Sequence, residues 1–199
     1  MCGSPFAIQR ELISRIARVA TKIVPEDYGL DLYFINRGSF HNRTAQEVDV
    51  ALRSIDPSGG TPIGTNLHRR ILKPLVYDVL SDPGRILRRP LLVCAITDGC
   101  PTGEYEGAFK SAIVECRETI RRAGYPSTAV RFSVSQIGSD SDATRFLDGL
   151  AGDVDIQDVV RCTTDRLDEK YRELRQNERE LETWLLQVLT NPIMENGRF

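Results

Sequence analysis

Apolar residues recur along this chain at two spacings, one typical of helices and one typical of strands. Between Phe6 and Val24 they return every third or fourth position, which predicts a helix with one buried face, and Pro25 ends it. A capping box formed by Thr44 and Glu47 predicts where the next helix begins. Helical spacing is found over residues 6–24, 45–55, 62–79, 108–123, 142–150 and 165–189, the last segment being long and highly charged.

Shorter apolar runs predict strands over residues 30–36, 91–97, 129–137 and 158–164. The second run, LLVCAIT, is continuously apolar, which favours a strand buried on both faces of a parallel sheet. The third run alternates apolar residues with Arg131, Ser133 and Ser135, so one of its faces is expected to be less deeply buried. Residues 36–42 are typical of a turn. The alternation of strands and helices predicts one Rossmann-like α/β domain over residues 1–199, with a mostly parallel sheet between two layers of helices.

Composition and charge narrow the classes of partner. The formal net charge of -2 supplies no field that attracts nucleic acid or an anionic membrane surface. The 5 cysteines are scattered without a C-x-x-C pair, which argues against a disulfide framework and for a reducing compartment. His41 and His68 have no further ligand at the spacing of a zinc site. Because no apolar run is long enough for a membrane span, we expect an intracellular, cytoplasmic protein.

The glycine-rich stretch SGGTPIGTNL, residues 58–67, is the strongest candidate for a ligand site. Glycines allow the backbone to approach a ligand closely, and threonines offer oxygen ligands. A P-loop is excluded because the stretch lacks lysine, and a dinucleotide-binding loop would follow the first strand rather than a helix. No nucleophile elbow is present, although Cys100 follows a buried strand. A Rossmann-like enzyme that uses Asp98 or Cys100 therefore stays open as an alternative.

Thr61 and Asp98 together suggest a site for a hard cation. Mg²⁺ prefers carboxylate, hydroxyl and water oxygens, and Asp98 directly follows the strand 91–97, whose carboxyl end would border the ligand crevice of an open α/β sheet. A structural interpretation also stands, in which Thr61 caps the helix that begins at Pro62 and Asp98 forms a turn with Gly99.

The segments PSGGTPIGTNL and AITDG, together with DLYFIN, resemble parts of von Willebrand factor type A domains. The first two are similar to the second and third segments of the family's metal-ion-dependent adhesion site, and the third is similar to its second strand. The order of elements agrees over nearly the whole chain, most closely with stand-alone intracellular members. The resemblance implies a non-enzymatic protein-interaction domain. In it Thr61 would supply a hydroxyl to Mg²⁺ or Mn²⁺, Asp98 would hold a metal-bound water, and an acidic side chain of a protein partner would complete the shell.

The first segment of that adhesion site, Asp-x-Ser-x-Ser at the end of the family's first strand, has no counterpart in this sequence. Alignment of the first helix without gaps places Met1 just after the family's last serine, whereas Ser4 becomes a candidate ligand only with a gap. The resemblance therefore implies a remnant site that binds metal poorly. It also implies that the central strand is missing, which leaves strands 30–36 and 91–97 as edges and the isolated chain marginally stable.

Two further expectations follow from the missing segment. The nucleotide sequence upstream of Met1 is expected to encode the strand and its metal ligands in frame. If it does not, a metal-free scaffold, to which a partner donates the absent strand, is the alternative to metal-dependent adhesion.

Overall fold

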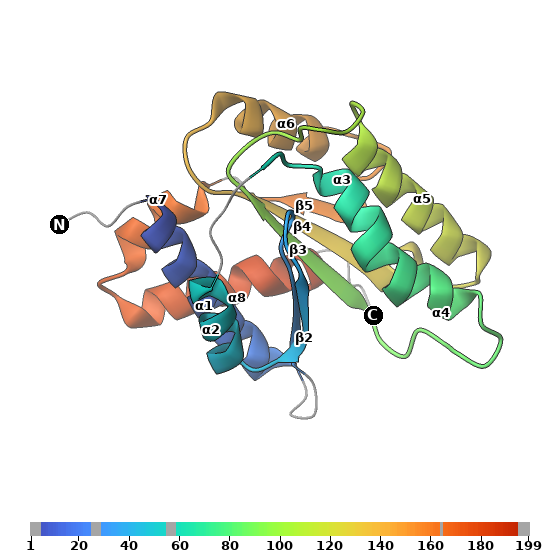
Figure 1. Cartoon of the computed structure of the whole chain (residues 1–199), viewed down its shortest axis with the longest axis horizontal. Coiled ribbons are helices and arrows are strands. Elements are labelled where there is room, and N and C mark those ends of the chain that lie inside the picture. Colours follow the sequence, from blue (N-terminus) through green and yellow to red (C-terminus); the bar gives the residue numbers. More distant parts are fainter. Residues whose placement is uncertain (1–4, 25–28, 55–58, 164, 195–199) are drawn as a thin grey trace.

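The fold is mixed α/β, with a three-stranded parallel sheet between helices (Figure 1). The structure is a computed structural model that describes residues 5–24, 29–54, 59–163 and 165–194, with the backbone alone for residues 5–7. The strands are β1 (Leu30–Tyr33), β2 (Ser39–Arg43), β3 (Leu91–Thr97), β4 (Val130–Gln136) and β5 (Val160–Cys162). The helices are α1 (Pro5–Ile23), α2 (Ala45–Arg53), α3 (Ile63–Asn66), the π-helix η1 (Leu67–Tyr77), α4 (Asp78–Leu80), α5 (Ala108–Arg122), the 3₁₀-helix η2 (Ser127–Ala129), α6 (Ser141–Ala151), α7 (Leu167–Leu174) and α8 (Glu178–Met194).

The parallel sheet has the strand order β3–β4–β5. The seven residues of β3 pair in register with the seven of β4, from Leu91 opposite Val130 to Thr97 opposite Gln136. Because β4 is central and helices cover both faces of the sheet, all of its residues are buried. The prediction that one face of this strand is less deeply buried is therefore wrong, and Arg131 and Ser133 are buried with the rest.

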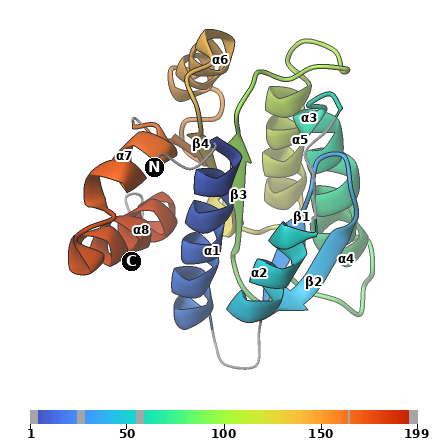
Figure 2. The same cartoon turned by 60° about the vertical axis from the view of Figure 1, so that its left-hand side comes forward.

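Each face of the sheet packs against its own helices (Figure 2). On one face, η1, α5 and α6 surround Phe132 and Val134 of β4 in the largest hydrophobic core. On the other face, α1, α7 and α8 build a second core that includes Leu12, Tyr171 and Leu181. Burial of the apolar side of each helix against the sheet is the main force that holds these layers together. This arrangement is compatible with a Rossmann-like layout.

Strands β1 and β2 form a separate antiparallel hairpin. The sequence predicts only a turn over residues 36–42, so β2 corrects that prediction, and the sheet structure is not one mostly parallel sheet but two sheets. The short turn at Ile35–Gly38 brings Tyr33 opposite Ser39. The hairpin packs through Leu30 and Leu32 against a third, small core between α1 and α2.

Most predicted helices are confirmed within a few residues, including the capping box of α2, in which Thr44 and Glu47 satisfy each other's backbone groups. The long helix predicted over residues 165–189 is wrong, because the chain forms α7 and α8 instead. Asn177 begins α8: its carbonyl accepts a hydrogen bond from Leu181 N, and its side chain accepts one from Glu180 N. The break lets both helices turn an apolar face toward the second core. None of the helices in the described ranges is long and apolar enough to cross a bilayer.

Candidate functional site

Two loops meet at the carboxyl end of β3 (Figure 1). One leads into α3 and contains Thr61, and the other follows β3 and contains Thr102. Thr61 N donates a hydrogen bond to Thr102 Oγ1 at 2.8 Å, and Thr102 N donates one to Thr61 O at 3.1 Å. This reciprocal pair holds the glycine-rich stretch against the loop that carries Asp98. The two segments singled out in the sequence are therefore neighbours in space.

Glu104 supplies the cap of α3. Its two carboxylate oxygens accept hydrogen bonds from Gly64 N at 2.9 Å and Thr65 N at 2.7 Å, at the positive end of the helix. Thr61, predicted as the cap, lies before Pro62, and the side chain of Pro62 at the cap position makes no hydrogen bond. That prediction is wrong. The carboxylate comes from 40 positions further along the chain, beyond the reach of a local capping pattern.

One glycine of the stretch has a packing role. A Cβ atom on Gly64 would lie 2.3 Å from Phe109 N and 2.5 Å from the carbonyl carbon of Ala108, so only glycine allows α3 to lie this close to α5. The glycines were first considered as a means of bringing the backbone near a ligand. At Gly64, the neighbour that is approached is another helix.

Thr61 and Asp98 lie on these two touching loops, and no contact joins their side chains in the described part of the chain. Asp98 is exposed and Thr61 is half-buried, and neither side chain has a hydrogen-bond or ion-pair partner among the described residues. Ser4 lies outside the described residues. Within those residues, no group of three His, Cys, Asp or Glu side chains could hold a metal ion.

The donor set at this crevice does not fit a protein-held Mg²⁺ or Mn²⁺ ion. One carboxylate and one hydroxyl supply two ligands and a single negative charge, whereas Mg²⁺ demands near-ideal octahedral geometry and dehydrates reluctantly. Glu104, which follows β3 on the same loop as Asp98, is already engaged by the amino end of α3. Thr61 and Asp98 therefore do not form a metal site by themselves.

A second feature borders the crevice, namely the open edge of β3. Ile137 N donates a hydrogen bond to Thr97 O at 2.9 Å, so the main chain of Thr97 points toward β4. Along a strand the main-chain groups of successive residues point to opposite sides. Leu92, Cys94 and Ile96 consequently direct their N–H and C=O groups away from β4, and no main-chain partner for them is found among the described residues.

The open edge is apolar. Leu92 and Ile96 are half-buried, and the Cys94 side chain is exposed to solvent. Burial nevertheless raises the pKa of the Cys94 thiol to about 12. The predicted burial of the strand on both faces is thus incomplete at Cys94.

The opposite edge of the sheet, β5, is protected in the way natural edge strands usually are. It has three residues, and its middle residue, Arg161, is exposed and charged. The β3 edge has seven residues and no charged side chain. It therefore lacks the short length and the charged side chain that protect β5 from pairing with another chain.

The hairpin is held beside this crevice by polar contacts. The Arg70 guanidinium of η1 donates hydrogen bonds to the carbonyls of Phe34 and Ile35, and Asn36 Nδ2 donates one to Gly60 O at 2.6 Å. On its other side the hairpin packs against α1. These anchors fix β1 without pairing it to β3, which agrees with the prediction that both strands are edges of their sheets.

No protein-family model, curated protein or solved structure matches this chain. The resemblance to von Willebrand factor type A domains therefore rests on the residues that carry it.

Proposed function

We propose that this chain is a non-enzymatic protein-interaction module of the von Willebrand factor type A class, which binds an extended segment of a partner protein along β3. The observation that supports the proposal is the open β3 edge, with the outward main-chain groups of Leu92, Cys94 and Ile96. Addition of a strand to such an edge is a common mode of protein recognition, in which main-chain hydrogen bonds give affinity.

The chemistry of the partner segment follows from the side chains that border the edge. Odd-numbered residues of β3, such as Leu91 and Val93, face the core with η1 and α5, whereas Ile96 faces the core with α1. A strand that continues the sheet needs apolar side chains on both faces, because each face is covered by helices. A short run rich in valine, isoleucine and leucine meets this requirement.

The crevice at the end of β3 is the place for an acidic side chain of the partner in this proposal. The Thr61 hydroxyl offers a donor there, while Asp98 opposes a carboxylate unless a cation is shared. We regard the metal site as a remnant. The affinity of the module then comes from strand pairing rather than from Mg²⁺.

The test uses a synthetic heptapeptide of valine, isoleucine and leucine as the probe strand. Amide hydrogen exchange in the free chain should be fast at Leu92, Cys94 and Ile96 and slow at Val93 and Ala95, which point toward β4. The probe should slow exchange at the first three residues only. A uniform exchange rate along β3 would contradict the assigned direction of its main-chain groups.

A matched pair of variants at Cys94 completes the test. Cys94→Pro removes an outward N–H and leaves the bonds to β4 intact, so it should abolish probe binding while the chain stays folded. Cys94→Ala keeps the N–H and should bind like the wild type. Equal binding by both variants would refute strand addition, and catalytic turnover that disappears in Asp98→Ala or Cys100→Ala would favour the enzyme alternative instead.

A further inference from the structure

A cavity of about 620 Å³ lies between β5 and α8, on the side of the sheet away from the open edge of β3. Trp184, Val188 and Pro192 form an apolar wall, and Thr163 and Asp165 contribute polar groups. A smaller recess of about 20 Å³ adjoins it, sharing Gln157, Val160, Arg161, Asn191 and Pro192 with its lining. The volume of the larger cavity is in the range of small-molecule sites.

An arginine that is largely buried lines the recess. Arg131 of β4 lines it and is only 7% exposed, and its guanidinium makes no hydrogen bond or ion pair among the described residues. Burial lowers the pKa of Arg131, while the charge of Asp158 opposes that effect. The nitrogens of Arg131 keep some contact with solvent, so the guanidinium has lost part of its hydration without gaining a hydrogen-bonded anion, and its donors are open to a ligand.

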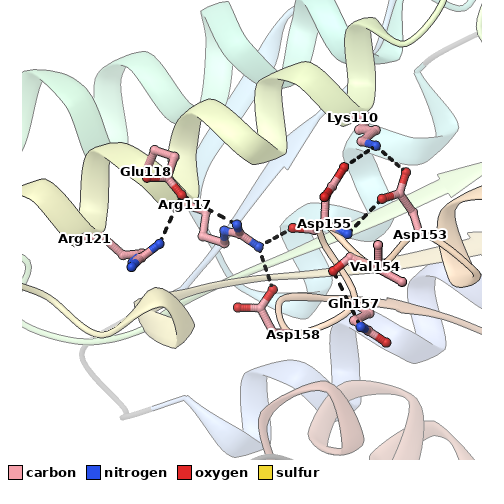
Figure 3. A network of polar contacts seen from close by, with 9 residues as sticks. All are labelled: Lys110, Arg117, Glu118, Arg121, Asp153, Val154, Asp155, Gln157 and Asp158. Carbon is pink, nitrogen blue, oxygen red and sulfur yellow. Dashed lines mark hydrogen bonds and ion pairs between the residues drawn. The ribbon is translucent and has the colours of Figure 1, made fainter.

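Asp158 does not fill that role, because other cations engage its neighbourhood (Figure 3). Arg117 of α5 donates a hydrogen bond to Asp158 Oδ1 at 3.1 Å and another to the carbonyl of Asp155. Lys110 pairs with Asp153 and Asp155 in the same network. The carboxylates of this loop are thus bound by side chains of α5. Arg131 is attracted by the charge of Asp158 but makes no direct hydrogen bond or ion pair with it.

A second polar group in the lining is unsatisfied. Thr163 Oγ1 is buried and has no hydrogen-bond partner in the described chain, and Thr163 lines the larger cavity. Arg131 and Thr163 therefore line two adjoining spaces, Arg131 the smaller recess and Thr163 the larger cavity. The exposed Arg161 lines both spaces and adds positive charge, and Asp165 adds a negative charge to the lining of the larger cavity.

We propose that this cavity binds a small molecule that carries an oxyanion group, with the oxyanion at Arg131 and an apolar or aromatic part against Trp184. A carboxylate or a phosphate monoester matches the planar fork of the guanidinium. Asp165 in the lining of the larger cavity disfavours a second anionic group. This site is separate from the β3 edge and does not depend on the function proposed for that edge.

Trp184 makes the test direct, because it is the only tryptophan of the chain. Its fluorescence is measured during titration with benzoate and with phenyl phosphate, which distinguish the two oxyanions, and with uncharged benzyl alcohol as the control probe. We expect a saturable change with at least one anion and a response at least about tenfold weaker with benzyl alcohol, since a charge-assisted hydrogen bond is lost.

Two variants locate the anion. Arg131→Met keeps the apolar stem without the charge and should weaken binding of the anion at least about tenfold. Arg145→Met, which removes an exposed arginine of α6, should leave the affinity unchanged. Equal affinity for anion and benzyl alcohol in the wild type would overturn the proposal, as would unchanged binding in Arg131→Met. If Arg131→Met does not fold, the proposal is still tested by comparing the affinities of the wild-type chain for the anionic probes and for benzyl alcohol.

Discussion

Removal of the Glu104 carboxylate is the sharpest test of how the crevice loops are held. In Glu104→Ala, Gly64 N and Thr65 N lose their acceptors, which lie at 2.9 and 2.7 Å, and the amino end of α3 loses a compensating negative charge. Capping interactions contribute about 0.5–2 kcal/mol, and single hydrogen bonds to charged groups about 1.5–3 kcal/mol. Because Glu104 is half-buried and water can replace part of the loss, we expect a decrease of about 2 kcal/mol in the free energy of unfolding.

This loss is large for a chain with an open sheet edge. For a domain of 199 residues, about 2 kcal/mol corresponds to a fall of about 4–8 °C in Tm, measured by circular dichroism. Glu104→Gln keeps one carbonyl oxygen as acceptor, so its free energy of unfolding should decrease by roughly half as much as in Glu104→Ala. Glu106→Ala removes an exposed neighbouring carboxylate and should change nothing. An unchanged Tm in Glu104→Ala, or an equal fall in Glu106→Ala, would refute the reasoning.

Three other predictions test the crevice and the packing around it. Calorimetry with Mg²⁺ should detect no binding beyond that of an acidic surface patch, and micromolar affinity that is lost in Asp98→Ala would show that the site is not a remnant. Gly64→Ala should destabilise the chain by about 1–3 kcal/mol in urea unfolding, because its Cβ would clash with the backbone at Phe109, and wild-type stability would contradict that close approach. Finally, the hydrogen bond from Lys110 lowers the pKa of Asp153, so the pair stabilises the fold above the unfolded pKa of this carboxyl and the contribution disappears as pH falls through the lower folded value. Asp153→Asn should therefore reduce the urea midpoint at neutral pH but not in strong acid, and an equal reduction at both would argue against the pair.

Local features of the sequence predicted local structure well. The capping box at Thr44 and Glu47 needs residues only three positions apart, and the structure confirms both of its hydrogen bonds. The run LLVCAIT predicted β3 with correct ends because continuous apolar, β-favouring residues have few other conformations that bury them. Asp98 was correctly placed at the end of that strand because it follows Thr97 directly, whereas the glycine-rich stretch is held there by the contacts of Thr61 with Thr102.

Features that depend on contacts distant in the sequence were not predicted. Glu104 caps a helix 40 positions away, and no capping pattern reaches that far. The break at Asn177 depends on how two short helices share one core, because the charged segment would otherwise read as one helix. Strand β2 was missed because its residues Ser39–Arg43 are polar, and only its pairing with β1 makes them a strand.

The sequence by itself determined the alternation of helices and strands, the apolar character of β3 and the position of Asp98 at the carboxyl end of a strand, because each depends on neighbouring residues. The tertiary structure alone decided which groups remain unpaired. The pairing of β3 with β4 directs the main chain of Cys94 to an open edge, and the packing of α8 over the sheet leaves Arg131 buried beside a cavity. Pairing and burial are properties of segments brought together from far apart, and residue order does not specify them without the fold.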